Sequence, residues 1–431
     1  MILRDPVHGL IAFESDEERV IEALLETREV QRLRRIRQLG YTSLTFPGAE
    51  HTRFAHAIGT AHVMKRLLQR LRDLHGALPS EHRLTRELAR DALAAALLHD
   101  VGHGPFSHLF EGALPHSDSH EVWTERIVLD QASETHSVLA TLDSEMPKRV
   151  AALINGRHSM PYLTRAVSGT FDVDRCDYLL RDAHATGVGY GYFDLEWLQR
   201  SLRFAPPSAN GSPPAMAIDG AKGIAAIESF VLARLFMFQQ VYFHKATRAA
   251  EWMVHTILGR AVQLLADGAK LPSTPSAIQM SALGETPSLE SYLELDDELL
   301  ATVLRAWQEC KDPALSDLCK RLRARKLFKT IEFLNNTHTN NTHKRWLDIA
   351  ADITTKAGLD PTLYLGLDIA ADTPFDDKND SLLVVFSKGP PRRPVDVSFL
   401  LSRLDGQELR RVRLIVAPEV RDDIRRAVDT E

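Results

Sequence analysis

The sequence contains a histidine followed directly by an aspartate, His99 and Asp100, where an apolar stretch ends. Residues 88–99 are apolar almost all round, as in a buried helix, and the glycine- and proline-rich residues 102–105 then break it. Neighbouring residues inside a helix point about 100° apart, but at a helix end the backbone can turn both toward one ion. An imidazole nitrogen with a carboxylate suits Mn, Fe, Zn or similar ions better than Ca.

Two further segments could complete such a site, because two ligands alone do not. Arg53 and His56 are three residues apart and share the helix face opposite the apolar stripe of residues 53–71. A second polar face covers two helical turns and consists of Asp174, Asp177, Tyr178, Arg181 and Asp182. A helix that faces the core would not tolerate this polar face without partners.

The elements that must position these residues are mostly helical. Apolar spacing predicts helices over 53–71, 88–99, 121–129, 148–154 and 224–265, and a short helix opened by Pro105. A surface hairpin is expected over 203–219, a loop over 335–343, strands over 363–369, 381–386 and 412–416, and a helix from Glu419. We therefore predict a mainly α protein with a small β-hairpin and a small C-terminal α/β segment.

Three segments are expected along the chain: a core over 1–265, a helical extension over 266–355 and a small α/β segment over 356–431. The Pro- and Ser-rich stretch 270–288 marks the first boundary.

The composition limits the class of protein. The 431 residues are 44% hydrophobic and 26% charged, which argues against a disordered chain, a collagen or a disulfide miniprotein. With 52 basic and 58 acidic side chains the net charge is −6, so the chain is no bulk nucleic-acid coat. Cys176, Cys310 and Cys319 have no metal-knuckle spacing and fit free thiols in a reducing compartment. With no apolar run of 18 residues, we expect a cytoplasmic protein without a membrane partner.

Five strings of residues resemble one known family. They are DPVHG (5–9), QRLRRIRQLG (31–40), FPGAEHTRFAHAIG (46–59), LLHDVGHGPFSHLFEG (97–112) and FDVDRCDYLLRD (171–182). Together they resemble the HD-domain metal-dependent phosphohydrolases, in the branch of the deoxynucleoside triphosphate triphosphohydrolases. The resemblance covers residues 1–255 well and 318–331 weakly, and it implies an HD-domain helical core.

The resemblance implies a role for each matching residue. The metal ligands would be His56, His99, Asp100 and Asp174, holding a divalent ion (Mn, Fe, Mg, Zn or Ni), with a second Mg at the phosphates. The catalytic residues would be His103, His108, Glu111 and His120; the family usually has Asp in place of Glu111, and the loop before His120 is shorter here. The substrate contacts would be Gln38, Leu39, Arg53, Arg175, Tyr178, Asp182, Arg234 and Tyr242.

Two aromatic residues depart from the family near the base, because Phe238 replaces a frequent histidine and Phe243 a frequent glutamine. Base preference is therefore open. The implied reaction is attack of water on the α-phosphorus, giving a deoxynucleoside and tripolyphosphate. Such a polyanion needs cations around it, and an imidazole near neutral pKa can donate a proton to the leaving oxygen.

Other functions stay open at this point. The same metal site could serve a phosphodiesterase, a nucleotidase or a single-strand nuclease, and basic clusters could bind nucleic acid. The arginines of residues 28–37 are either such a patch or a solvated helix face. The basic residues between Lys320 and Lys329 resemble a segment that contacts a regulatory nucleotide in some family members, and the resemblance also implies a homo-oligomer.

Overall fold

The computed structural model describes residues 1–106, 114, 118–205, 214–333, 340–377 and 382–429. The first half of the chain is helical. Its helices are α1 (Arg19–Leu25), α2 (Arg28–Arg32), α3 (Arg53–Asp73), α4 (Arg86–Leu98), α6 (His120–Leu129), α7 (Glu134–Leu142), α8 (Met146–Ile154), α9 (Pro161–Val167), α10 (Val173–Thr186) and α11 (Leu195–Arg200). The protein is thus mainly α, as predicted, and the short helix expected to begin at Pro105 falls largely on residues outside the described ranges.

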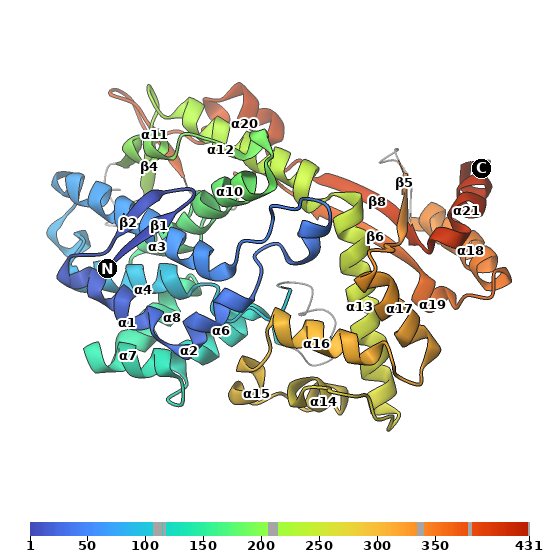
Figure 1. Cartoon of the computed structure of the whole chain (residues 1–431). Helices are drawn as coiled ribbons and strands as arrows, with labels where there is room; N and C mark the ends of the chain where they lie inside the picture. Colours follow the sequence, from blue (N-terminus) through green and yellow to red (C-terminus); the bar gives the residue numbers. More distant parts are fainter. Residues whose placement is uncertain (107–113, 115–117, 206–213, 334–339, 378–381, 430–431) are drawn as a thin grey trace.

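Local signals set the ends of the three helices that matter most. The Thr52 and Thr85 side chains accept backbone N–H groups at the starts of α3 and α4, and Asp172 does so for α10. Gly187, in the left-handed region at φ 75°, ends α10. Helix α3 packs against both α4 and α10, and the three helices form the centre of the first half (Figure 1).

The predicted long helix 224–265 is in fact interrupted. It divides into α12 (Ile224–Met237), a π-helical turn at Phe238–Tyr242 and α13 (Lys245–Ala266). His244 is extended, and its side chain accepts the backbone N–H of Ala246, so that α13 starts as a new helix. The apolar period continues through the interruption because both helices face the core, and this concealed the break.

The segment Ile224–Tyr242 is long and apolar enough to cross a membrane by length and composition alone. A core helix passes the same test. Here the segment packs against α10 and α11, its Ile227 and Phe230 are fully buried, and its Arg234 pairs with Asp372. These contacts place one face of the segment in the core of the protein.

The later helices are α14 (Ser276–Ala282), α15 (Leu289–Leu293), α16 (Asp297–Trp307), α17 (Pro313–Arg323), α18 (Asn340–Lys356), α19 (Pro361–Tyr364), α20 (Phe399–Leu404) and α21 (Arg421–Asp429). The expected loop 335–343 is wrong in its last part, because residues 340–343 open α18; residues 334–339 lie outside the described ranges. The N- and C-termini lie at opposite ends of the molecule (Figure 1).

Three small sheets accompany the helices. Strands β1 (Ile2–Asp5) and β2 (Gly9–Ala12) form an antiparallel N-terminal hairpin, which sequence reasoning missed. The predicted hairpin is present as β3 (Leu202–Phe204) against β4 (Met216–Asp219), and β7 (Leu383–Val385) adds to it in parallel; residues 206–213 lie outside the described ranges. The third sheet has the order β5 (Lys329–Phe333), β8 (Leu409–Val416), β6 (Leu365–Asp372).

The sheets connect parts of the chain that are distant in sequence. Strand β4 of the expected core pairs with β7, and β5 of the expected extension pairs with β8. The stretch 270–288 contains α14. The division into 1–265, 266–355 and 356–431 stays a prediction, and a single hydrophobic core holds residues of all three segments, such as Leu97, Trp307 and Ile415.

Candidate metal centre and substrate cavity

Three predicted ligands, from three helices or helix ends, converge on one point. His56 lies on α3, His99 follows α4 and Asp174 lies in the first turn of α10. The His56 and His99 Nε2 atoms are 3.3 Å apart, and they lie 3.0 and 3.3 Å from Asp174 Oδ1. Two nitrogens and a carboxylate oxygen within ligand reach of one point form a donor set for a divalent transition-metal ion.

The other ring nitrogen of each histidine has a hydrogen-bond acceptor. His56 Nδ1 lies 2.8 Å from Asp177 Oδ2, and His99 Nδ1 lies 2.9 Å from the Ala96 carbonyl oxygen. A neutral imidazole that donates through Nδ1 carries its lone pair on Nε2. The two lone pairs would then face each other, which is unfavourable unless a cation or a proton lies between them. The donor set therefore fits a metal ion.

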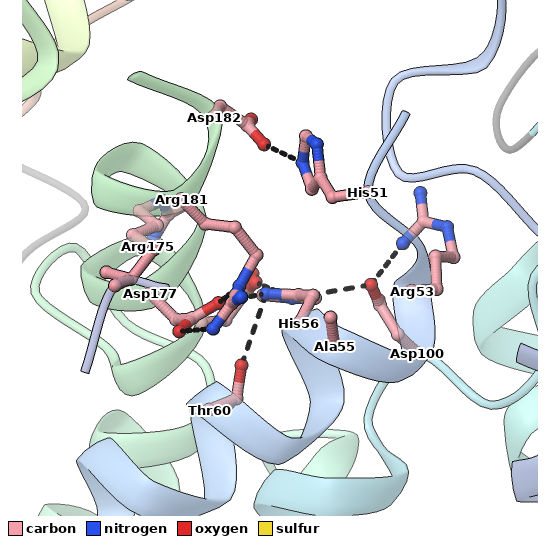
Figure 2. Close-up of polar contacts among 12 residues, drawn as sticks. His51, Arg53, Ala55, His56, Thr60, Asp100, Arg175, Asp177, Arg181 and Asp182 are labelled. Atoms are coloured by element: carbon pink, nitrogen blue, oxygen red, sulfur yellow. Dashed lines mark hydrogen bonds and ion pairs between the residues drawn. The ribbon is translucent and has the colours of Figure 1, made fainter. Parts of the chain in front are cut away.

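Asp100, the fourth predicted ligand, lies beside this point. Its Oδ1 is 3.5 Å from His99 Nε2, and its Oδ2 is 3.7 Å from His56 Nε2 and forms an ion pair with Arg53. Figure 2 shows His56 between Asp177 with Arg181 on one side and Asp100 with Arg53 on the other.

Asp100 also belongs to a second group of possible ligands, with His103 and His120. Its Oδ1 lies 3.3 Å from His103 Nε2, and the His103 and His120 rings stack with centroids 3.9 Å apart. Two predicted catalytic imidazoles thus lie next to the predicted metal ligands. The other two predicted catalytic residues, His108 and Glu111, lie outside the described residues.

The charges around His56 determine its protonation without metal. Burial opposes the charged imidazolium, but the bonds to Asp174 and Asp177 outweigh it and raise the pKa of His56 to about 10. In the metal-free protein His56 therefore carries a proton where a metal ion would bind, so metal binding must release this proton.

A buried network of hydrogen bonds and ion pairs supports His56. Two of its members, Asp177 and Arg181, were identified from the sequence, but Asp5 and His8 were not. Asp177 accepts two bonds from Arg181, at 2.8 and 3.0 Å, and lies 2.6 Å from His8 Nε2; Arg181 also donates to Asp5 at 2.8 Å. His8 and Asp5 come from the N-terminal hairpin, whose pairing across some 170 residues no local signal predicts.

Close approach of α3 and α10 requires Gly59. A Cβ atom at this position would lie 1.9 Å from Asp177 Oδ1 and 2.3 Å from Arg181 Nη2. Since both groups are already fixed by ion pairs, any other residue would push α10 away from His56.

A cavity of about 480 Å³ contains most of the predicted substrate contacts. Of the eight, the lining includes Gln38, Leu39, Arg53, Tyr178, Asp182 and Tyr242. The departures Phe238 and Phe243 line it too, as do Gly40, Thr42, Phe106, Thr247, Arg248 and Glu251. Arg53 joins the cavity to the candidate metal centre because it also pairs with Asp100.

Asp182 organises one wall of this cavity. The Tyr242 hydroxyl donates to Asp182 Oδ2 at 2.8 Å, and His51 Nε2 lies 2.8 Å from Oδ1. His51 was not predicted, although it stands inside the string FPGAEHTRFAHAIG. Two side chains thus hold one buried carboxylate in place.

The remaining two predicted contacts, Arg175 and Arg234, are engaged within the protein. Arg175 donates to the Gly169 carbonyl and pairs with Asp172, while Arg234 pairs with Asp372 at 2.6 Å. Neither is among the residues that line the cavity, so their substrate-binding role stays a prediction.

The loop after Asp100 is held by residues beyond the HD motif. The Tyr292 hydroxyl donates to the Gly102 carbonyl at 2.6 Å, and the buried Arg32 donates to the His103 carbonyl at 2.8 Å. Asp297 accepts the backbone N–H of Phe106 at 2.8 Å. The segment with α15 and α16 therefore fixes the backbone that carries His103.

Most of the N-terminal arginines are paired and do not form a basic patch. Arg28, Arg35 and Arg37 pair with Glu290, Asp296 and Glu50 respectively. Arg32 is buried, and Arg34 lies over the Phe54 ring.

Asp177→Asn should lower the affinity for a divalent ion about 10- to 100-fold, because a neutral amide holds the His56 Nδ1–H less firmly. Calorimetric titration with Mn²⁺ would measure this. The matched control is Asp91→Asn, which removes another buried carboxylate, paired with Arg149, on α4. Both variants should lose stability; an equal loss of metal affinity in both would contradict the role of Asp177.

Tyr292→Phe should lower kcat about tenfold and change KM less, because it frees the Gly102 carbonyl and loosens the loop that carries His103. Steady-state kinetics would test this. Tyr162→Phe is the control, since its hydroxyl also donates to a backbone carbonyl, that of His82, away from the cavity. Unchanged kcat in Tyr292→Phe would show that the bond does not position the loop.

Comparison with known protein families agrees with this geometry. The HD domain family matches residues 53–182, and the family described as the HD associated region matches residues 214–430, half of the chain. The uncharacterized protein YwfO of Bacillus subtilis is 38% identical over 375 residues, which cover 87% of this chain and 81% of that protein.

More distant relatives and solved structures agree. The deoxynucleoside triphosphate triphosphohydrolase SAMHD1 of Danio rerio is 25% identical, over 82% of this chain and 59% of its own length. A crystal structure of a phosphohydrolase from Bacteroides thetaiotaomicron matches with a TM-score of 0.80 and 26% identity, over 96% of this chain and 99% of the other. A hypothetical protein from Aquifex aeolicus matches with a TM-score of 0.73 and 27% identity, over 99% of both chains. The chain belongs to the HD-domain phosphohydrolases with an HD-associated region, and it is an enzyme with His/Asp groups that suit a divalent metal ion.

Proposed function

We propose that this phosphohydrolase cleaves deoxynucleoside triphosphates into the deoxynucleoside and tripolyphosphate. The observation that carries the proposal is the position of the 480 Å³ cavity, which meets the candidate metal centre at Arg53 and is lined by Tyr178, Asp182 and Tyr242. The SAMHD1 relatives, 25–27% identical, bear the name of this activity and support it.

Each part of the substrate has a matching part of the site. Arg53 offers a guanidinium for the phosphates, and it would have to share or exchange its bond to Asp100. The paired Tyr242 and Asp182 would hold the deoxyribose, where they would exclude a 2′-hydroxyl sterically. His56, His99, Asp100 and Asp174 would hold the ion.

The proton transfers fall to this chain's own imidazoles. A divalent ion at the centre supplies Lewis-acid activation of water and neutralises phosphoryl charge. Attack of water on the α-phosphorus breaks its bond to the 5′-oxygen of the deoxynucleoside, so that the α-phosphorus stays in the tripolyphosphate. A positioned imidazole would donate the proton that the leaving 5′-oxygen needs. His103 and His120, whose rings stack beside Asp100, would make that donation.

Each dNTP, incubated with purified enzyme and Mn²⁺ or Mg²⁺, should give equal amounts of deoxynucleoside and tripolyphosphate by ion-exchange chromatography. Asp174→Asn should lower kcat at least ~100-fold, because it weakens both the ligand set and the hold on His56. Glu196→Gln, an exposed acid on α11, should leave the rate unchanged. Release of monophosphate or pyrophosphate instead would contradict the proposal.

The second candidate reaction is hydrolysis of phosphodiesters or nucleoside monophosphates at the same centre. The aromatic lining by Phe238 and Phe243 favours it, since bases stack on such rings. The paired N-terminal arginines count against a nuclease, because they offer few free cations to a nucleic-acid backbone. Cleavage of oligonucleotides by the wild type but not by Asp174→Asn would favour this alternative.

A regulatory nucleotide is also proposed for the Lys320–Lys329 region. A separate cavity of about 380 Å³ is lined by Lys245, Arg325, Lys329 and Arg421, among others. Four cationic side chains around one cavity suit a polyphosphate. The expected homo-oligomer is part of this proposal.

Lys329→Ala should reduce activation by a second nucleotide about tenfold while the basal rate stays the same, because it removes one phosphate-binding charge. Rates measured with one dNTP against increasing concentrations of another would show this. Lys326→Ala removes a nearby charge that does not line the cavity and is the control. Equal activation of wild type and Lys329→Ala would exclude this residue from the regulatory site.

A further inference from the structure

One group of polar residues in the substrate cavity has no place in the chemistry described so far. Thr247, Arg248 and Glu251 lie on α13 and line the cavity. Thr247 is only 1% exposed, and its hydroxyl has no hydrogen-bond partner in the described part of the chain. Since buried polar groups are almost always hydrogen-bonded, an unpaired hydroxyl on a cavity wall indicates a ligand.

The other residues that line the cavity are assigned to the phosphates and the sugar, so Thr247, Arg248 and Glu251 remain to contact the base. Arg53 lies beside the candidate metal centre, because it pairs with Asp100. Tyr178 lies one turn of α10 after the predicted ligand Asp174. Asp182 follows Asp174 by about 12 Å along the same helix and is joined to Tyr242. The proposed function, on which this inference rests, puts the phosphates at the candidate metal centre and the sugar at Asp182. The base then contacts the remaining polar residues of the cavity wall, Thr247, Arg248 and Glu251.

This group places a hydrogen-bond donor next to an acceptor. Arg248 Nη1 donates to Glu251 Oε2 at 2.8 Å, while its Nε and Nη2 donate to Asp368 Oδ1 at 3.1 and 2.6 Å. Asp368 thus fixes the orientation of the Arg248 guanidinium. Burial raises the pKa of the Glu251 carboxyl to about 7 although Arg248 lowers it, so this group gains from a ligand that donates N–H bonds.

A guanine edge matches this arrangement better than the other bases. Guanine presents an acceptor, O6, beside two donors, N1–H and N2–H₂. A carboxylate can accept both N–H groups while a neighbouring guanidinium donates to O6. Adenine and cytosine present a ring-nitrogen acceptor where guanine presents N1–H, and it would face the carboxylate. Phe238 and Phe243, which also line the cavity, provide surfaces for stacking.

We infer that Thr247, Arg248 and Glu251 form a base-recognition subsite that selects guanine among the deoxynucleotides. Glu251 accepts the N1–H and N2–H₂ groups, Arg248 donates to O6, and the Thr247 hydroxyl bonds to a further polar atom of the base. A site built on such bonds rejects bases that leave its polar groups unpaired.

The test measures binding and turnover separately. Calorimetry gives the dissociation constants of the four deoxynucleosides with metal-loaded enzyme, and kinetics give kcat/KM for the four dNTPs. Deoxyguanosine should bind at least about tenfold tighter than the others. Glu251→Gln should remove about tenfold of this preference, and Thr247→Val, similar in shape, should weaken deoxyguanosine binding about threefold. Glu285→Gln and Thr302→Val, exposed positions outside the cavity, are controls.

The outcomes separate this inference from the proposed reaction. Equal binding of the four nucleosides, binding of none, a preference for any nucleoside other than deoxyguanosine, or an unchanged preference in Glu251→Gln overturns the guanine subsite, even if all dNTPs are hydrolysed. Selective binding of deoxyguanosine that both variants weaken supports it, even if no dNTP is hydrolysed and the proposed function fails. Thr247→Val keeps the test valid should Glu251→Gln fail to fold.

Discussion

The site depends on the meeting of two imidazole nitrogens, His56 Nε2 and His99 Nε2, 3.3 Å apart beside Asp174. Each ring has its other nitrogen at an acceptor, so the two inward nitrogens can share this space only around a positive charge. A proton satisfies the requirement in the metal-free protein, and a bound divalent ion would do so in its place. The packing of three helices keeps the nitrogens in this arrangement, and the catalytic chemistry follows from it.

Holding His56 there requires a buried charge, Asp177, and a buried charge is tolerated only when it is paired. Arg181 and His8 provide the pairing, and Asp5 in turn holds Arg181. The first strands of the chain are thus part of the metal centre although no residue in them is a predicted ligand. The same principle applies to Arg248 on α13, which pairs with Asp368 and Glu251.

Local patterns predicted much of this, and long-range pairing accounts for most of the rest. The helices at 53–71 and 88–99 and the polar face of Asp174 were predictable because period, caps and glycines act within a few residues. The break at Phe238–Tyr242 was not, because both flanking helices are apolar. Strands β1, β2 and β5 are short and weakly patterned, and β5 pairs with a strand about 80 residues away. The roles of His8 and Tyr292 could not be predicted, since each acts through a distant backbone or side chain; the string DPVHG resembled the family but assigned His8 no role.

The bonds from Tyr292 and Asp297 to the loop after Asp100 have an evolutionary consequence. The part of the chain that carries the predicted metal ligands and the later part with α15 and α16 are not interchangeable, since the later part supplies the hydrogen bonds that hold the loop after Asp100. A chimera that joined the first portion of one relative to the second portion of another would have to bring these tyrosine and aspartate partners along with the loop. Substitutions on the two sides are therefore expected to accumulate in matched pairs.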